Sequence, residues 1–264
     1  MRAILTVVAM LGCHREADLG STPQLFGKLA NVSVHDTVDE VEAIDYRLAS
    51  GTQVDDGALS YRIELDSDHR IRSAIIWSKG SIDEVTSSWG DGVVGSEHKR
   101  NARFYFDPLR RTRYEVSSTD EGFVVQAMPY RPLDEILDAD EGVKVFGIDL
   151  FALAPTDVVA ALDGKLLSTS RFAGPTTVVH TENNVATDAG DVGLMVEVRQ
   201  DVVSYSLEFE TGAFVDGSER VRALLARKWG PPHQDGHADL YRTTHASRIR
   251  VREHEGFTDI EVDR

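Results

Sequence analysis

Histidines near the C-terminus have the spacing that comes closest to a metal site. His233 and His237 stand four residues apart in the run PPHQDGH, a spacing that aligns two imidazoles on a helix, and Asp235 could add a carboxylate. His245 and His254 follow closely enough to supply a third ligand. The run comes after a helix stop and contains a glycine, so we expect a loop with solvated histidines. His233 and His237 are therefore weak candidates for ligands, and we predict no metal.

The motifs of the common catalytic classes are missing from this sequence. Gly164 and Lys165 form the pair nearest to a phosphate-binding loop, but the upstream glycine is absent and a leucine follows. The chain has neither a dinucleotide-binding glycine pattern nor the serine motif of the α/β-hydrolases. We predict a protein without catalytic residues or a cofactor. The alternative is a hydrolase or a metal-dependent enzyme that uses the region from His233 to His254.

Charge is distributed unevenly along the chain. The sequence has 44 acidic and 28 basic residues, a formal net charge of −16, which opposes binding to nucleic acid. Six bases nevertheless fall between Lys99 and Arg113, among aromatic residues, and four arginines fall between Arg242 and Arg252. Either these side chains face outward and pair with acids across a sheet, or they form a surface for a partner. The second interpretation predicts as partner-binding residues Arg103, Tyr105, Arg110, Arg111, Arg113, Tyr241, Arg248 and Arg250.

The only cysteine, Cys13, follows the run MRAILTVVAMLG. One basic residue, an apolar stretch too short to span a bilayer and a small residue before the cysteine form the layout of a secretory signal with its cleavage site. The alternative is a buried N-terminal strand with an inert cysteine. With one cysteine, no disulfide can form within the chain.

These N-terminal residues resemble a bacterial lipobox. Gly12 and Cys13 occupy its last two positions, and Met10 and Leu11 stand where the usual pattern has a leucine and a smaller residue. The resemblance implies removal of the leader, lipidation of Cys13 and stable anchoring through several acyl chains. His14, in place of an aspartate, implies by the same analogy an outer-membrane lipoprotein that faces the periplasm or the cell surface.

Landmarks recur in the same order in the two halves of the chain, 120 to 140 residues apart. Repetition of several landmarks at a similar spacing indicates an internal duplication. The pairs are Phe26 and Phe146, Ile63 and Val196, Trp89 and Trp229, Ala102–Tyr105 and Ala238–Tyr241, and Gly122-Phe123 and Gly256-Phe257.

Each half predicts a helix, a hairpin, a second helix and three strands. The first helix begins near Asp36, and the second helix of each half has capping-box spacing and ends in Trp-Gly. The predicted fold class is α+β, a tandem repeat of two modules with helices packed on a mostly antiparallel sheet. The predicted boundaries are 1–12 for the signal peptide, 13–24 for the lipidated cysteine and its tether, 25–130 for the first module, 131–143 for a linker and 144–264 for the second module.

In the order of their elements, these modules resemble small modules of outer-membrane assembly lipoproteins and of tandem β-lactamase-inhibitor proteins. The resemblance implies a scaffold that binds another protein, and it transfers no functional residue because here a hairpin separates the helices. We expect a lipid-anchored, non-catalytic binding protein of the cell envelope with a protein or glycan partner. The most specific version of this prediction is an inhibitor or an immunity protein. A structural envelope component is a further alternative.

Lipidation is tested by intact mass and membrane fractionation after expression in a Gram-negative host. We expect a membrane-bound species that begins at acylated Cys13 and that a lipoprotein signal peptidase inhibitor prevents from forming. An unprocessed soluble chain would overturn the envelope location.

Overall fold

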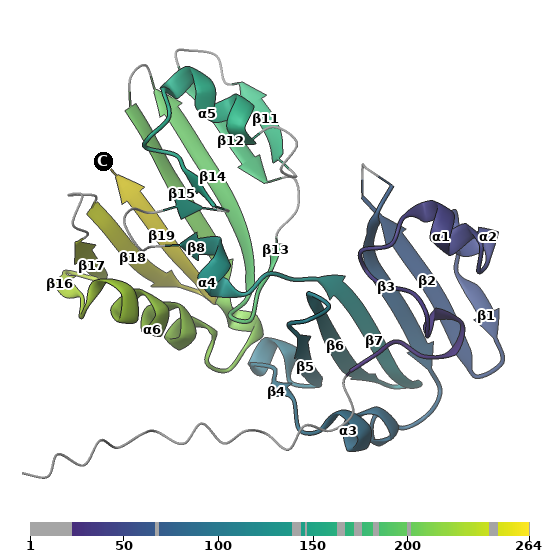
Figure 1. The fold of residues 1–264 in the computed structure, drawn as a ribbon. Helices are drawn as coiled ribbons and strands as arrows, with labels where there is room; N and C mark the ends of the chain where they lie inside the picture. The colour runs from purple at the N-terminus through teal and green to yellow at the C-terminus, as the bar shows by residue number, and fades with distance from the viewer. Residues whose placement is uncertain are drawn as a thin grey trace, which may run out of the picture.

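The structure is a computed structural model, shown in Figure 1. The predicted leader, Cys13 and all but the end of the predicted tether lie outside the described residues, which therefore do not test the lipobox prediction. No helix in the described part of the chain is long and apolar enough to cross a membrane. The structure describes residues 23–66, 69–138, 144–145, 147–162, 167–171, 176–181, 185–199, 202–242 and 248–263.

The first half of the chain forms an antiparallel sheet that has seven strands in the described residues, in the order β1-β2-β3-β7-β6-β5-β4. Its elements are η1 (Gly27–Leu29), α1 (Val38–Glu42), α2 (Tyr46–Ala49), β1 (Val54–Asp56), β2 (Leu59–Leu65), β3 (Ile71–Ser78), α3 (Asp83–Trp89), β4 (Val93–Val94), η2 (Glu97–Lys99), β5 (Ala102–Asp107), β6 (Thr112–Thr119) and β7 (Gly122–Pro129).

The second half contains a larger antiparallel sheet, whose described strands follow the order β11-β12-β14-β15-β19-β18-β17-β16, with β13 beside β14. A small sheet of β8, β9 and β10 precedes it. The elements are α4 (Leu133–Ile136), β8 (Leu137–Asp138), β9 (Lys144–Val145), β10 (Ile148–Asp149), α5 (Pro155–Leu162), β11 (Leu167–Arg171), β12 (Thr176–Thr181), β13 (Val185–Ala186), β14 (Asp191–Arg199), β15 (Val202–Glu210), η3 (Thr211–Ala213), α6 (Gly217–Trp229), β16 (His233–Asp235), β17 (Ala238–Arg242), β18 (Arg248–His254) and β19 (Phe257–Asp263).

Seven strands of the second sheet repeat the strand order of the first. The path β12-β14-β15-β19-β18-β17-β16 has the connectivity of β1-β2-β3-β7-β6-β5-β4, and a helix, α3 or α6, follows the third strand of each path. The two halves therefore have one topology, an α+β arrangement of antiparallel sheets with a few helices, and β11 extends the second sheet at one edge.

The backbone registers relate two pairs of landmarks to each other. In the first sheet, successive cross-strand partners lead from Tyr105 to Ile63, and in the second they lead from Tyr241 to Val196. Both paths cross the same number of strands without a slip, so each landmark of the first sheet reaches its counterpart in the second. The intermediate positions are Tyr114, Ala127 and Ala74 in the first sheet and Ile249, Val262 and Tyr205 in the second.

The Gly-Phe landmark is out of register by one residue. Counted along the strands from Ala127 and Val262, Phe123 corresponds to Thr258 and not to Phe257. Gly122 is the first residue of β7, with φ 147° and the Ser78 carbonyl where a Cβ would lie, whereas Gly256 belongs to the turn before β19. The two glycines thus meet different backbone requirements.

The first predicted helix is divided into two short helices. Thr37 and Glu40 form a capping box at the start of α1, one residue after the expected cap at Asp36. Asp45 then starts α2, since its side chain accepts a hydrogen bond of 3.0 Å from the backbone N–H of Arg47. A residue that caps a new helix ends the preceding one, because an N-cap has non-helical backbone angles.

Alternation along the strands separates a buried face of each sheet from a more polar one. On β14, Leu194 and Val196 are buried while Met195 is exposed. The buried side chains of the second sheet form one cluster with Val221, Leu224 and Leu225 of α6. In the first sheet, Val41, Leu48 and Val85 of the three short helices join the corresponding cluster.

A tryptophan at the end of one helix contacts a buried tyrosine in both halves. The ring centroids of Trp89 and Tyr105 are 5.3 Å apart, and those of Trp229 and Tyr241 are 6.2 Å apart. The following glycines, Gly90 and Gly230, have φ angles of 85° and 80°, which a residue with a side chain rarely adopts.

Burial of tyrosines predicts a loss of stability in alkali. Burial, followed by the negative charge of Asp188, raises the pKa of Tyr130 to about 12, and burial also raises the pKa of Tyr105, Tyr114 and Tyr241. Above the ordinary value of 10.0 the unfolded chain loses tyrosine protons that the folded chain retains, so stability falls as the pH rises toward 12. Thermal unfolding between pH 8 and 12, with tyrosinate absorbance, should show Tm falling from about pH 10. A constant Tm across that range would contradict this assignment.

Candidate functional site

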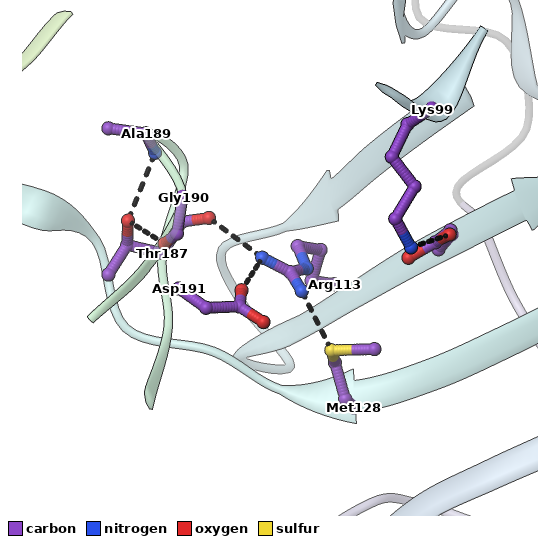
Figure 2. A network of polar contacts seen from close by, with 8 residues as sticks. Lys99, Arg113, Met128, Thr187, Ala189, Gly190 and Asp191 are labelled. Carbon is purple, nitrogen blue, oxygen red and sulfur yellow. Dashed lines mark hydrogen bonds and ion pairs between the residues drawn. The ribbon is translucent and has the colours of Figure 1, made fainter. Parts of the chain in front are cut away.

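The buried side chain of Arg113 joins the two halves of the chain. Arg113 lies on β6 and its side chain is only 3% exposed, yet it ion-pairs with Asp191 at the start of β14. Its guanidinium also donates to the Thr187 carbonyl at 3.4 Å and contacts the Met128 sulfur at 2.9 Å (Figure 2). Arg113 was predicted to bind a partner, and its burial corrects that prediction: the charge is used inside the molecule.

The contacts of Arg113 between the two halves of the chain form what we call the junction. Aromatic side chains from both halves lie around this guanidinium. The Arg113 carbon Cζ is 5.7 Å from the ring centroid of Phe104 and 5.9 Å from that of Phe214, distances typical of cation–π contacts. The rings of Phe104 and Phe214 are themselves 4.5 Å apart. Phe104 belongs to the first sheet and Phe214 follows η3 in the second half, so the contact is apolar as well as ionic.

Backbone pairing adds to the junction at two further places. Isolated bridges connect Gly95 with Phe214 and Tyr130 with Ala186. The backbone N–H of Leu133 also donates to Asp188 at 2.8 Å. These contacts fix the direction in which the chain leaves β7 and enters the second half, as Figure 1 shows for the segment from β7 to α4.

The turn between β5 and β6 presents the most exposed large apolar side chain of the described residues. Leu109 is 96% exposed, and its neighbours Arg110 and Arg111 have side chains that are 54% and 44% exposed. We call residues 108–111 the β5–β6 tip. A fully exposed leucine beside two cations is a combination that a protein partner can bind through both apolar and charged contacts.

Hydrogen bonds to the buried Asp107 carboxylate and to the Arg110 carbonyl define the conformation of the β5–β6 tip. The carboxylate of Asp107, 3% exposed, accepts hydrogen bonds from the backbone N–H groups of Leu109 and Arg110 at 3.1 and 3.0 Å. The Arg110 carbonyl accepts from the Thr112 hydroxyl at 3.0 Å and contacts His35 Nε2 at 2.9 Å. The tip is therefore preorganised, although Arg111 has a left-handed backbone with φ 51°.

The other predicted partner-binding residues have partners within the chain or belong to the core. Tyr105 and Tyr241 are 4% and 2% exposed, which corrects their assignment to a partner surface. Their place against the tryptophans explains the repeated tyrosine. Arg103 donates to the Asp91 carbonyl at 2.6 Å, Arg248 lies 3.5 Å from Asp235 and Arg250 lies 2.9 Å from Glu261.

The histidine run does not form the loop that was expected. His233 lies on β16, an exposed edge strand, opposite Leu240 of β17, and His237 follows in the turn. Among the described residues neither histidine belongs to a group that could hold a metal ion. The turn at Gly236, with φ 64°, closes this hairpin, and pairing with β17 gives His233 its extended backbone.

A different histidine stands in the one potential ligand group found within the described residues. Glu208, His254 and Asp259 offer ligand atoms that all lie within 4.8 Å of one another. His254 Nδ1 is 3.4 Å from Asp259 Oδ2. Burial raises the pKa of the Asp259 carboxyl group above its ordinary value, against the opposing effect of His254. The sequence run that contains His254 showed a candidate ligand, but not its two carboxylate neighbours.

Two shallow hollows mark the surface of the described chain. One, of about 310 Å³, lies beside η3 and the β18–β19 turn, and its lining includes Phe214 and Val215. The other, of about 420 Å³, lies beside η2 and is lined by charged residues that include Lys99, Arg100 and Glu115. Lys99 and Glu115 form an ion pair of 2.8 Å across this hollow.

Comparisons with protein families, with curated proteins and with solved structures found no match for this chain.

Substitutions of Asp191 and Arg113 test the junction. Asp191→Ala should lower the free energy of unfolding by about 3 kcal/mol, because it leaves the buried Arg113 charge without its carboxylate. Arg113→Met should cost less, since the apolar side chain fills much of the space and the remaining Asp191 side chain is 34% exposed. Urea denaturation measures both values.

The matched control is Glu261→Ala, which removes a carboxylate from two exposed or half-buried arginines. Its cost should stay below about 1 kcal/mol. A larger loss for Arg113→Met than for Asp191→Ala would contradict the view that the unpaired buried cation is the costly species.

Proposed function

We propose that this protein is a non-catalytic binding protein of the cell envelope, anchored through a lipid on Cys13, and that it holds a protein partner at the β5–β6 tip. The observation that carries the proposal is the 96% exposure of Leu109 on a turn held by the buried Asp107. A rigid, exposed anchor loses little conformational freedom on binding, so more of its contact energy appears as affinity.

Charge supports the same surface. Arg110 and Arg111 stand beside Leu109 in a chain whose formal net charge is −16. An acidic partner patch would be attracted locally to these cations while the rest of the molecule repels it, which favours one orientation of approach. Arg111 is already paired with Glu135, and Arg110 lies 3.5 Å from Asp107, so both cations have defined positions before a partner arrives.

The shared topology supports a scaffold produced by duplication. We infer that the two sheets are copies of one module with helices packed on a sheet face, and that the junction at Arg113 makes them one rigid support. The most specific version of this function is that of a dedicated inhibitor or immunity protein. A periplasmic enzyme and a structural envelope component are the competing functions, and a glycan is the competing kind of partner.

Partner capture from envelope extract tests the β5–β6 tip. The wild-type protein should retain one stoichiometric partner, and Leu109→Ala should weaken its binding about tenfold or more, a loss typical of a central apolar contact. The double variant Arg110→Glu with Arg111→Glu should reduce the association rate and make binding less dependent on salt. Titration of the captured partner measures both effects.

The matched control is the double variant Lys79→Glu with Arg227→Glu. It changes the net charge by the same amount at two exposed positions. Lys79 lies in the loop between β3 and α3, and Arg227 lies on α6. We expect binding to be unchanged in this control. Equal binding by the wild-type protein and by all tip variants would remove the tip from the function.

A further inference from the structure

The geometry points to a binding site for a divalent transition-metal ion, with Zn²⁺ as the representative, formed by Glu208, His254 and Asp259 on the second sheet. The site is separate from the β5–β6 tip and does not depend on the proposed partner. It lies where three neighbouring strands, β15, β19 and β18, run side by side.

The strand registers bring these three side chains to the same face. Glu208 of β15 lies directly opposite Asp259 of β19. Asp259 lies opposite Arg252 of β18, so His254, two residues further along β18, is the diagonal neighbour of Asp259. Side chains at direct and diagonal positions are within contact distance on one face of a sheet.

Two carboxylates in directly opposite positions repel each other unless a positive charge compensates them. On the same face, Glu261 has that compensation, because Arg250 and Arg252 lie 2.9 and 3.1 Å from it. Within the described residues, the pair Glu208 and Asp259 has His254 as its close basic partner, and Arg252, opposite Asp259, adds a weaker positive influence. A bound cation would supply the charge that the arginines supply to Glu261.

The two carboxylate oxygens of Asp259, whose side chain is 27% exposed, differ in their contacts. Its Oδ1 atom is buried and accepts no hydrogen bond from any described residue, while Oδ2 lies 3.4 Å from His254 Nδ1. An unsatisfied buried carboxylate oxygen is costly, and coordination to a cation is one of the few contacts that would satisfy it. The His254 ring stacks on Phe257, with centroids 5.7 Å apart, which restricts its orientation.

The ligand set selects the class of ion. One imidazole and two carboxylates suit Zn²⁺ and similar transition metals, whereas Mg²⁺ and Ca²⁺ prefer sites made of oxygen alone. His254 is 52% exposed, so water can fill the remaining coordination positions. The nearby Arg252 cation opposes metal binding and limits its strength.

Calorimetric titration with Zn²⁺ alone tests the site. The full chain should carry Cys13→Ser, so that its only thiol cannot bind zinc. We expect one saturable site, a rise of Tm with zinc by mass action, and a decrease in affinity of about tenfold or more in His254→Ala and in Asp259→Asn.

The matched control is His233→Ala, which removes an exposed histidine on β16 and should leave zinc affinity unchanged. Circular dichroism should show all variants folded, because the substituted side chains are not part of the core. Absence of saturable zinc binding, or equal loss of affinity in His233→Ala and His254→Ala, would overturn the assignment. An NMR titration that shifts the His254 imidazole resonances before those of other histidines would support it independently.

Discussion

Burial of the Arg113 guanidinium is the interaction on which the relation between the two halves depends. A charge that is almost fully enclosed must stay paired, because an isolated buried cation costs several kcal/mol. Its carboxylate, Asp191, and one of its two aromatic neighbours, Phe214, belong to the other half of the chain. The start of β14 and the residue after η3 are consequently tied to β6, and this links two sheets that each have their own core.

Pairing with carboxylates also explains why runs of arginine in this sequence do not mark a continuous basic surface. A strand arginine on the open face of a sheet lies within reach of acids on the neighbouring strand, as Arg250 and Arg252 do with Glu261. Exposed pairs of this kind contribute little to stability, but they neutralise the face. Turn residues have fewer cross-strand neighbours, and there the cations stay beside the exposed Leu109.

Two expectations failed where a single capping or pairing contact decided the local structure. One helix was predicted to begin near Asp36, and Val41 and Leu48 are both buried, but Asp45 caps a second helix between them. The histidine run was expected to form a loop, yet pairing with β17 makes His233 part of an edge strand. In each case a hydrogen-bonding contact with a nearby residue, and not the hydrophobic pattern, determined the local structure.

The sequence by itself predicted the repeated landmarks and, in coarse form, the alternation of helices and strands, but not every strand. Helix ends at Trp-Gly and alternating strands are set by local backbone preferences and by periodicity, which do not need the rest of the molecule. The tertiary structure alone decided which arginines are exposed, since Arg113 and Arg110 look alike in the chain but one is buried and the other exposed. It also decided that His254 meets Glu208 and Asp259, because strand register brings together residues that are far apart in the sequence.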